Sequence, residues 1–226
     1  SSGNLTAETV TVTIPEGYTV RQTIRLLAEK GVNTEENLLE AARTATYDYS
    51  FINNNSEDPS RLEGYLFPDT YIFYQNMDPV QALNKMILRF DEVFNEEMRE
   101  EAAANGQTIH DIVTIASMIE KETDGTDQAH IASVIYNRLT NTSAETVGLL
   151  GIDATLVYAL GRPITQDDYQ TADTPYNTYK YQGLPPGPIS NPGMVAIRAA
   201  MNPDSTSDYY YVLGNDGKHH FFKTLK

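Results

Sequence analysis

Polar and apolar residues alternate over residues 9–14, which read Thr-Val-Thr-Val-Thr-Ile. An alternation of period two is typical of a half-buried β-strand. After a Pro-Glu-Gly turn the apolar positions change to helical spacing as far as Gly31, and a second short helix is predicted to begin at Asn33 or Thr34. A strand followed by two short helices therefore predicts a compact N-terminal unit.

A polar, turn-rich segment at residues 53–61 predicts a boundary between a module over residues 1–57 and a domain over residues 58–226. Beyond this boundary an aromatic-rich segment precedes a long helix beginning at Pro79. Four further helices are predicted, with starts at Thr108, at Thr126 or Asp127, at Asp153 as N-cap, and at Asn191 as N-cap. Residues 208–222 predict a β-hairpin that turns at Asn-Asp-Gly. The expected fold class is α+β, with a helix-rich second domain carrying a small sheet or hairpin.

The amino-acid composition excludes several kinds of site and disfavours one class of binding partner. The chain has 226 residues, 31 acidic and 16 basic, with a net charge of −15 and no cysteine. It can therefore form no disulfide, thiolate zinc site or cysteine nucleophile, and its acidity disfavours a nucleic acid partner. No apolar run approaches the roughly 20 residues that span a bilayer, and the first residues lack the regions of a signal peptide. We expect any membrane anchor to lie upstream of this sequence.

Six motifs follow one another along the chain: LEGYLFPDTY, ASMIEKET, IASVIYNRL, DATLVYAL, PYNTY and GLPPGPISNPGMVAIRAAMNP. Together they resemble the endolytic murein transglycosylase family (MltG or YceG-like proteins) of the bacterial cell envelope. The resemblance extends from residue 62 to the last residue. The N-terminal unit is similar to the LysM-like module that precedes the catalytic region in that family.

This resemblance implies cleavage within peptidoglycan glycan strands at the MurNAc-β-1,4-GlcNAc bond, with formation of a 1,6-anhydro-MurNAc end. It also implies an extracytoplasmic enzyme, held by one N-terminal membrane helix that this sequence does not include. Cell-wall synthases are possible partners, and no metal or organic cofactor is implied. Relatives often have Leu-Gln-x-Asp where this chain has Leu150-Gly151-Ile152-Asp153, so any role of that glutamine is in doubt here.

Glu120 and Glu122 lie on either side of Lys121 at the end of an apolar helix. Breaking a glycosidic bond needs an acid for the leaving oxygen. One carboxyl group is enough for a lytic transglycosylase, because the C6 hydroxyl of the sugar attacks intramolecularly. Helical spacing favours Glu122 only slightly as the inward residue. The resemblance implies that Glu122 is catalytic, and partial burial should raise its pKa. As an alternative to a direct role in the reaction, Glu120 and Lys121 are charged surface residues at the helix end.

Six further residues are candidates for binding the sugar: Glu63, Asn137, Asp153, Tyr176, Asn177 and Tyr179. Glu63 either pairs within the fold or faces the substrate. Asn137 and Asp153 would position hydroxyl groups or support the acid. The other three lie in a Pro- and Gly-rich loop, and tyrosines suit a sugar because the ring is flat and the hydroxyl is polar. The alternative for the tyrosines is packing in the core. His219 and His220 are adjacent, so a strand would point them to opposite faces and a metal pair is not expected.

Two other functions remain open on the sequence alone. A non-catalytic peptidoglycan-binding module would use the tyrosines to hold glycan while Glu122 does nothing. A pyridoxal-phosphate aminodeoxychorismate lyase would need a Schiff-base lysine and a phosphate cup. Lys121 and Lys180 have no Gly-rich phosphate loop beside them in the sequence, which disfavours the lyase.

Overall fold

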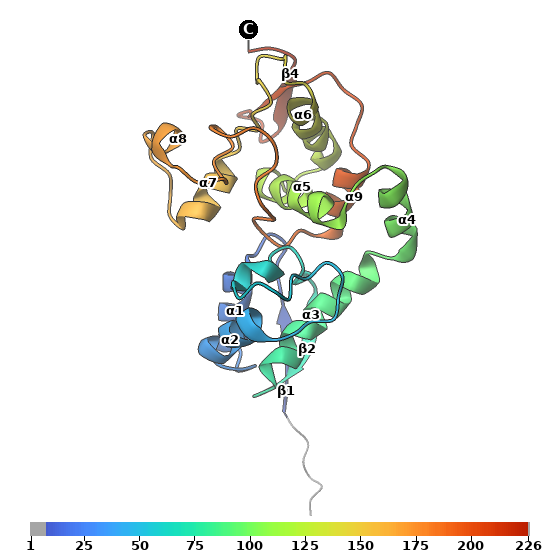
Figure 1. Cartoon of the computed structure of the whole chain (residues 1–226), viewed down its shortest axis with the longest axis vertical. Helices are drawn as coiled ribbons and strands as arrows, with labels where there is room; N and C mark the ends of the chain where they lie inside the picture. Colours follow the sequence, from blue (N-terminus) through green and yellow to red (C-terminus); the bar gives the residue numbers. More distant parts are fainter. Residues whose placement is uncertain (1–7, 226) are drawn as a thin grey trace, which may run out of the picture. The chain divides into compact units, whose positions relative to one another are not determined.

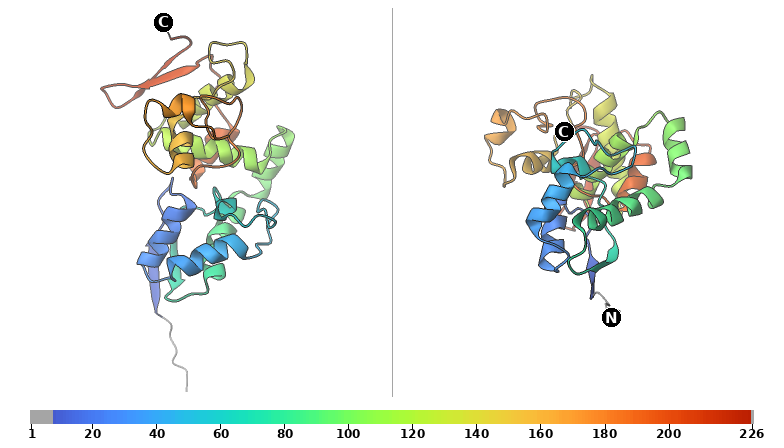
Figure 2. Two further views of the ribbon diagram at one scale, coloured as in Figure 1. Left: turned by 60° about the vertical axis from the view of Figure 1, so that its left-hand side comes forward. Right: turned by 60° about the horizontal axis from the view of Figure 1, so that its bottom comes forward.

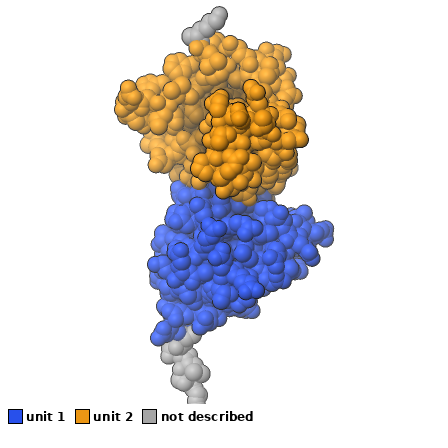
Figure 3. All heavy atoms as spheres, turned by 90° about the vertical axis from the view of Figure 1, so that its left-hand side faces the viewer, with its two compact units in different colours: residues 1–101, 190–193 blue, residues 102–189, 194–226 orange. Residues whose placement is uncertain are grey.

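The computed structural model describes residues 8–225 of the chain. It forms two compact units, coloured separately in Figure 3. Unit 1 comprises residues 1–101 and 190–193, and unit 2 comprises residues 102–189 and 194–226. A short segment from late in the sequence therefore belongs to the N-terminal unit.

The described part of unit 1 contains a two-stranded antiparallel sheet and the helices α1, α2 and α3 (Figure 1). Its elements are β1 (Thr9–Thr13), α1 (Val20–Glu29), α2 (Glu35–Thr44), the 3-10 helix η1 (Pro59–Leu62), β2 (Thr70–Tyr74) and α3 (Pro79–Val93). In the sheet Val12 pairs with Tyr71, and both side chains are buried. Because β2 is the partner of β1, the segment at residues 53–61 lies inside unit 1, and the structure divides the chain after residue 101 instead.

Local sequence signals explain where these helices begin. Thr19 forms a capping box with Gln22 at the start of α1, and the Thr34 hydroxyl accepts the N–H of Asn37 at the start of α2. Each cap satisfies a backbone donor that has no partner inside the helix. The amphipathic faces then pack together around large, fully buried side chains: Ile24, Leu27, Leu38, Leu83, Met86 and Phe90.

The prediction that Asn191 caps a helix is wrong, because α9 (Met194–Met201) begins three residues later. Asn191 is fully buried in unit 1. Its Oδ1 accepts the backbone N–H groups of Gly64 (2.8 Å) and Leu66 (3.1 Å), and its Nδ2 donates to the Tyr18 carbonyl (2.8 Å). The side chain thus serves as a hydrogen-bonding partner for buried backbone that no helix or strand satisfies.

Unit 2 is helical around α5 (Ile109–Glu122), whose residues 112–119 are all buried. The helices α6 (Gln128–Thr140), α7 (Asp153–Leu160) and α9 pack against α5, and α8 (Asp168–Thr171) is a single turn. Thr108 caps α5 as predicted. The acidic helix α4 (Glu96–Ala104), which the sequence pattern did not separate from α3, leads from one unit into the other.

The predicted hairpin near the C-terminus is confirmed. Strands β3 (Tyr210–Leu213) and β4 (His219–Phe222) pair antiparallel, and β3 packs against α6 (red and yellow-green in Figure 2). The turn uses Asp216, whose side chain accepts the N–H of Lys218, and Gly217, which adopts a positive φ of 77°. A helix-rich fold with two small antiparallel sheets confirms the α+β class. No helix within residues 8–225 combines the length and apolar character needed to cross a membrane.

Candidate active site

Glu122 is the last residue of α5, where the buried helix reaches the surface of unit 2. Its side chain is half-buried, and Oε1 accepts a hydrogen bond from the hydroxyl of Tyr211 on β3. Burial raises the pKa of Glu122 above the ordinary value, whereas the hydrogen bond from Tyr211 lowers it. The negative charge of Asp153 raises this pKa further, and the charges of Arg138 and His219 oppose that effect. The net result is a carboxyl group that holds its proton to higher pH than an exposed glutamate.

A second polar cluster begins at the next residue, Thr123, the C-cap of α5. Its hydroxyl donates to Oδ1 of Asp127 (2.5 Å), and Nδ1 of His219 is 2.7 Å from Oδ2 of the same aspartate. Burial acts to raise the pKa of Asp127, but the hydrogen bonds from Thr123 and His219 outweigh it, so the pKa lies below the usual range. This cluster ties the hairpin to the α5–α6 junction beside Glu122.

Arg138 of α6, whose charge acts on Glu122, holds two backbone carbonyls. Its Nε donates to the Tyr209 carbonyl (2.7 Å) and its Nη1 to the Leu150 carbonyl (2.5 Å). Its guanidinium carbon is 5.7 Å from the centre of the Tyr210 ring and 5.6 Å from that of the Tyr211 ring, within the range of a cation–π contact. One side chain therefore connects α6, the segment before α7 and the hairpin.

Asp153 is the first residue of α7, and the N-cap is Ile152, so the predicted capping role of Asp153 is wrong. The carboxylate instead accepts hydrogen bonds from two tyrosine hydroxyls, Tyr169 to Oδ2 (3.1 Å) and Tyr179 to Oδ1. Those two rings meet edge to face, with centroids 4.6 Å apart. Because Asp153 also acts on the pKa of Glu122, the tyrosine pair belongs to the surroundings of the acid.

Gly151, which stands at the glutamine position of the Leu-Gln-x-Asp pattern, lies directly against Tyr179 and Arg138. Gly151 adopts a φ of +57°, a left-handed conformation that favours glycine. A Cβ atom built there would be 3.4 Å from Cε1 of Tyr179 and 3.9 Å from Nη1 of Arg138. A side chain at residue 151 would therefore point toward two groups that surround Glu122.

Two predicted binding residues hold backbone within unit 2. Nδ2 of Asn137 donates to the carbonyls of Thr206 and Asp208, both at 2.9 Å. Asn177 is fully buried, and its Nδ2 donates to carbonyls of α8 and its C-cap while its Oδ1 accepts the N–H of Tyr179 (3.0 Å). Both amides thus shape the segments that carry the tyrosines around Glu122.

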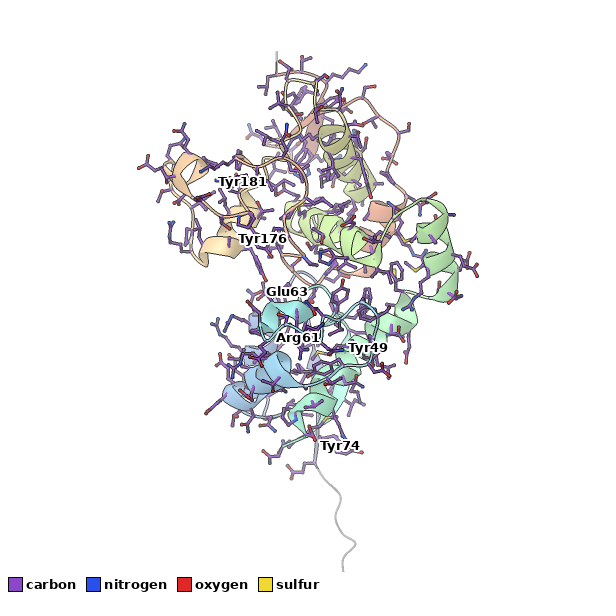
Figure 4. The ribbon with its side chains drawn as sticks, in the orientation of Figure 1. Tyr49, Arg61, Glu63, Tyr74, Tyr176 and Tyr181 are labelled. Carbon is purple, nitrogen blue, oxygen red and sulfur yellow. The ribbon has the colours of Figure 1, made fainter. Side chains whose placement is uncertain are left out.

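Tyr176 lies on the segment after α8, as Figure 4 shows together with Tyr181. Its ring is partly exposed and stands 5.5 Å from that of Tyr158 on α7. The Tyr181 hydroxyl donates to Asp173, which also lies 3.6 Å from Nζ of Lys180. The loop therefore presents aromatic faces that are not part of the core.

Glu63 belongs to unit 1 and is buried, with 3% of its surface exposed (Figure 4). Its Oε1 accepts the N–H of Val20, the first residue of α1, at 2.9 Å, and lies 3.3 Å from Nδ2 of Asn191. A carboxylate at a helix N-terminus is stabilised by the unpaired N–H groups there. Of the two alternatives for Glu63, this packing favours pairing within the fold.

Sequence patterns did not single out Tyr211 or Arg138, and they indicated Asp127 only as one of two possible helix starts. The signal that could have found Tyr211 is the hairpin register, which puts Tyr211, His219 and Phe221 on one face of the ribbon. Their rings do cluster, with the Tyr211 and His219 centroids 5.5 Å apart at 88°. His220 points the other way and pairs with Asp216, in agreement with the expected split of the two histidines. Among the described residues, no three His, Asp or Glu side chains are grouped to hold a metal ion.

Comparison with known proteins adds an independent observation. The family model of the YceG-like family matches residues 2–226. The chain is 36% identical to the endolytic murein transglycosylase of Bacillus subtilis (strain 168), over 92% of this chain and 56% of that protein. It is 31% identical to the endolytic murein transglycosylase of Streptococcus pneumoniae serotype 2 (strain D39 / NCTC 7466), over 89% of this chain and 40% of that protein. The chain thus spans about half the length of the curated relatives it matches.

A crystal structure of a yceG-like protein from Listeria monocytogenes superposes with a TM-score of 0.78. The two sequences are 33% identical, and the match covers 96% of this chain and 73% of the other. Sequence and fold agree over nearly all of the chain, and the chain belongs to the YceG-like family.

Proposed function

We propose that this protein is an endolytic peptidoglycan lytic transglycosylase that cleaves the MurNAc-β-1,4-GlcNAc bond and leaves a 1,6-anhydro-MurNAc end. The observation that carries the proposal is Glu122, a half-buried carboxyl group whose pKa is raised by burial and whose Oε1 is held by Tyr211. The names of two relatives, both endolytic murein transglycosylases, support the same reaction.

In the first step Glu122 acts as a general acid. Its proton passes to the glycosidic oxygen, the bond from that oxygen to C1 of MurNAc breaks, and positive charge develops at C1. The raised pKa matters here because only the protonated carboxyl group can act, and burial keeps a larger fraction protonated near neutral pH. The GlcNAc of the leaving strand departs with a free hydroxyl group.

In the second step the Glu122 carboxylate acts as a base. It takes the proton of the C6 hydroxyl of the same MurNAc, and that oxygen bonds to C1 to close the anhydro ring. No water is consumed, and the carboxyl group regains its proton. Because well-oriented intramolecular attack reaches effective molarities of roughly 10⁵ M or more, the tethered hydroxyl outcompetes water without a second catalytic carboxylate.

We infer that Tyr176 and Tyr179, with Asp153, contact the sugars, because these residues are partly or fully exposed and two of them surround the acid. Asn137 and Asn177 support binding indirectly through the backbone that they hold. In this proposal the tyrosine rings stack on sugar faces and the carboxylate accepts a sugar hydroxyl.

We also propose that the β1–α1–α2 segment of unit 1 is a LysM-like module. The strand–helix–helix order that suggested it is present, and β2 adds a partner strand. The proposed reaction requires a position outside the cytoplasmic membrane, where peptidoglycan lies. An N-terminal membrane anchor and contacts with cell-wall synthases remain proposals that follow from family membership.

Mass spectrometry of glycan strands digested by the wild type, Glu122→Gln and Glu120→Gln tests the reaction and its acid. Anhydro-ended fragments, each lighter than a hydrolysis product by one water, are expected from the wild type and from Glu120→Gln. Glu122→Gln should lose at least about 10²-fold in rate, the lower end expected for a general acid. Glu120→Gln is the matched control, since it removes a carboxylate from the same helical turn.

Other outcomes would overturn specific parts of the proposal. Products with free reducing ends would make the protein a hydrolase with a second carboxylate. Full activity in Glu122→Gln together with a loss in Glu120→Gln would move the acid to Glu120. Glycan binding without cleavage by the wild type would favour a non-catalytic binding module.

A further inference from the structure

The C-terminal hairpin contributes the group in contact with the carboxyl of Glu122. The Tyr211 hydroxyl donates its hydrogen bond to Oε1, although 89 residues separate the two positions in sequence. The ring of Tyr211 is held by neighbours of two kinds, the guanidinium of Arg138 at 5.6 Å and the edge-on ring of His219 at 5.5 Å. His219 is in turn fixed by Asp127.

We propose that Tyr211 is a positioning residue, which confines the transferable proton of Glu122 to Oε2. This inference rests on the proposed function, because it assigns a role within the same proton transfer. Tyr211 acts through Glu122, because its hydroxyl contacts Oε1 and not the oxygen that carries the proton.

The physical reason lies in the two kinds of oxygen in a protonated carboxyl group. One is a carbonyl oxygen, a good acceptor, and the other carries the proton and is a donor. A phenol that donates to Oε1 makes Oε1 the carbonyl oxygen and leaves the proton on Oε2. The acid therefore presents its proton from one defined atom, which is the orientation that efficient transfer to a glycosidic oxygen needs.

The same hydrogen bond stabilises the state that follows proton loss. A hydrogen bond to a carboxylate is roughly twice as strong as one to a neutral carbonyl. The Tyr211 bond thus strengthens as the proton leaves Glu122, and it contributes more to the transition state than to the ground state. Arg138 favours this, because a cation near the ring makes the phenol a better donor.

Several charged or titratable groups face Glu122 besides Tyr211. They come from four parts of unit 2: Arg138 of α6, Asp153 of α7, His219 of β4 and Tyr179 of the segment before α9. All of them are retained when the Tyr211 hydroxyl alone is removed. A change in the titration of Glu122 in Tyr211→Phe therefore reports the loss of that hydroxyl.

The first test needs no substrate. Protein labelled with ¹³C at glutamate side-chain carboxyl carbons is titrated by NMR, and Glu122→Gln identifies the Glu122 signal. The pKa of Glu122 is expected to rise by about one unit or more in Tyr211→Phe, the shift that corresponds to one hydrogen bond to a charged group. Tyr210→Phe, which removes a hydroxyl from the adjacent hairpin residue, should leave it unchanged. An equal pKa in wild type and Tyr211→Phe would overturn the inference.

The second test measures the pH dependence of anhydro-product formation. Tyr211→Phe should lower kcat by about 10-fold or more with little change in KM, and the basic limb of the profile should move to higher pH with the pKa of the acid. A purely structural role would lower activity without moving that limb. If the wild type forms no anhydro product, the proposed function fails, whereas the NMR titration still decides whether Tyr211 controls Glu122.

A variant without the risk of misfolding complements these tests. Replacing Tyr211 alone with 3-fluorotyrosine keeps the hydroxyl but makes it more acidic and thus a stronger donor. The pKa of Glu122 should then fall below the wild-type value, the opposite direction from Tyr211→Phe. A rise or no change would contradict donation from Tyr211 to Glu122.

Discussion

Replacing Asn191 with alanine should destabilise unit 1 far more than loss of a helix cap would. In the structure this fully buried amide is bonded to Gly64, Leu66 and Tyr18 through their backbones and to the carboxylate of Glu63. Alanine removes the acceptor of two buried N–H groups and the donor to two oxygens. Residues 64 and 66 lie between η1 and β2, outside the helices and strands of the described chain, so their N–H groups do not take part in a helical or ladder hydrogen bond of their own.

The expected size follows from these contacts. A buried polar group left without its partner costs about 1–3 kcal/mol. The two N–H groups account for most of the loss, and water that enters the vacated space can restore part of it. The free energy of unfolding should therefore fall by about 2–5 kcal/mol. A residue acting only as a helix N-cap would cost typically about 1 kcal/mol, so the measurement separates the observed role from the role that the sequence suggested.

Urea denaturation followed by far-UV circular dichroism gives the change in stability, and amide hydrogen exchange localises it. The N–H groups of Gly64 and Leu66 should exchange at least about 30-fold faster in Asn191→Ala, as expected for a loss of 2 kcal/mol or more. Asn202→Ala, an exposed substitution just after α9, is the control and should change stability by less than about 0.5 kcal/mol. A loss of less than about 1 kcal/mol in Asn191→Ala, with unchanged exchange at residues 64 and 66, would refute the reasoning.

Two further predictions concern the surroundings of Glu122. Gly151→Ala and Gly161→Ala both put alanine at a positive φ, so each should lower the free energy of unfolding by about 1 kcal/mol in thermal or urea unfolding. Only Gly151→Ala, which approaches Tyr179, should also reduce glycan cleavage. Equal activity in the two variants would contradict that contact. The lowered pKa of Asp127 stabilises the folded state above the unfolded value of about 3.9, and this contribution is lost as pH falls through the lower folded-state value. Asp127→Asn should therefore lower the free energy of unfolding at pH 7, and this loss should shrink as pH falls below about 3.9 and through the folded-state pKa of Asp127, because the wild type then loses its carboxylate. An equal loss at every pH would argue against this role.

Much of the fold could be predicted from local sequence patterns. The strand over residues 9–14, the helix beginning at Pro79 and the hairpin turn follow from alternation, helical spacing and turn residues, which act over a few neighbours. Helix α4 was missed because its acidic, alanine-rich sequence continues the polar face of α3 without a strong break. The pairing of β1 with β2 joins residues about 60 apart, and no local pattern reports it.

In the candidate site, too, local features could be predicted from the sequence and long-range contacts could not. Glu122 could be proposed because its helix and motif are local. Asp153 was a candidate for positioning hydroxyl groups or supporting the acid, with the capping of a short helix as the alternative. The contacts that give these carboxylates their properties come from Tyr211 and Tyr179, which the chain brings in from distant segments. At Asn191 the local pattern was misleading. The sequence there is typical of a helix start, but the Asn191 side chain instead accepts a buried backbone N–H 127 residues away.

The position of the hairpin at residues 210–222 has a consequence for the order in which the protein matures. Ribosomes make the chain from the N-terminus, so α5 and its Glu122 emerge well before Tyr211, which donates a hydrogen bond to that carboxyl group. During synthesis or passage through a narrow channel, a nascent chain that ends before residue 211 has the carboxyl group without its partner. The contact between Glu122 and Tyr211 can therefore form only after the hairpin at residues 210–222 has joined the fold, so the final environment of this carboxyl group is among the last parts of unit 2 to be completed.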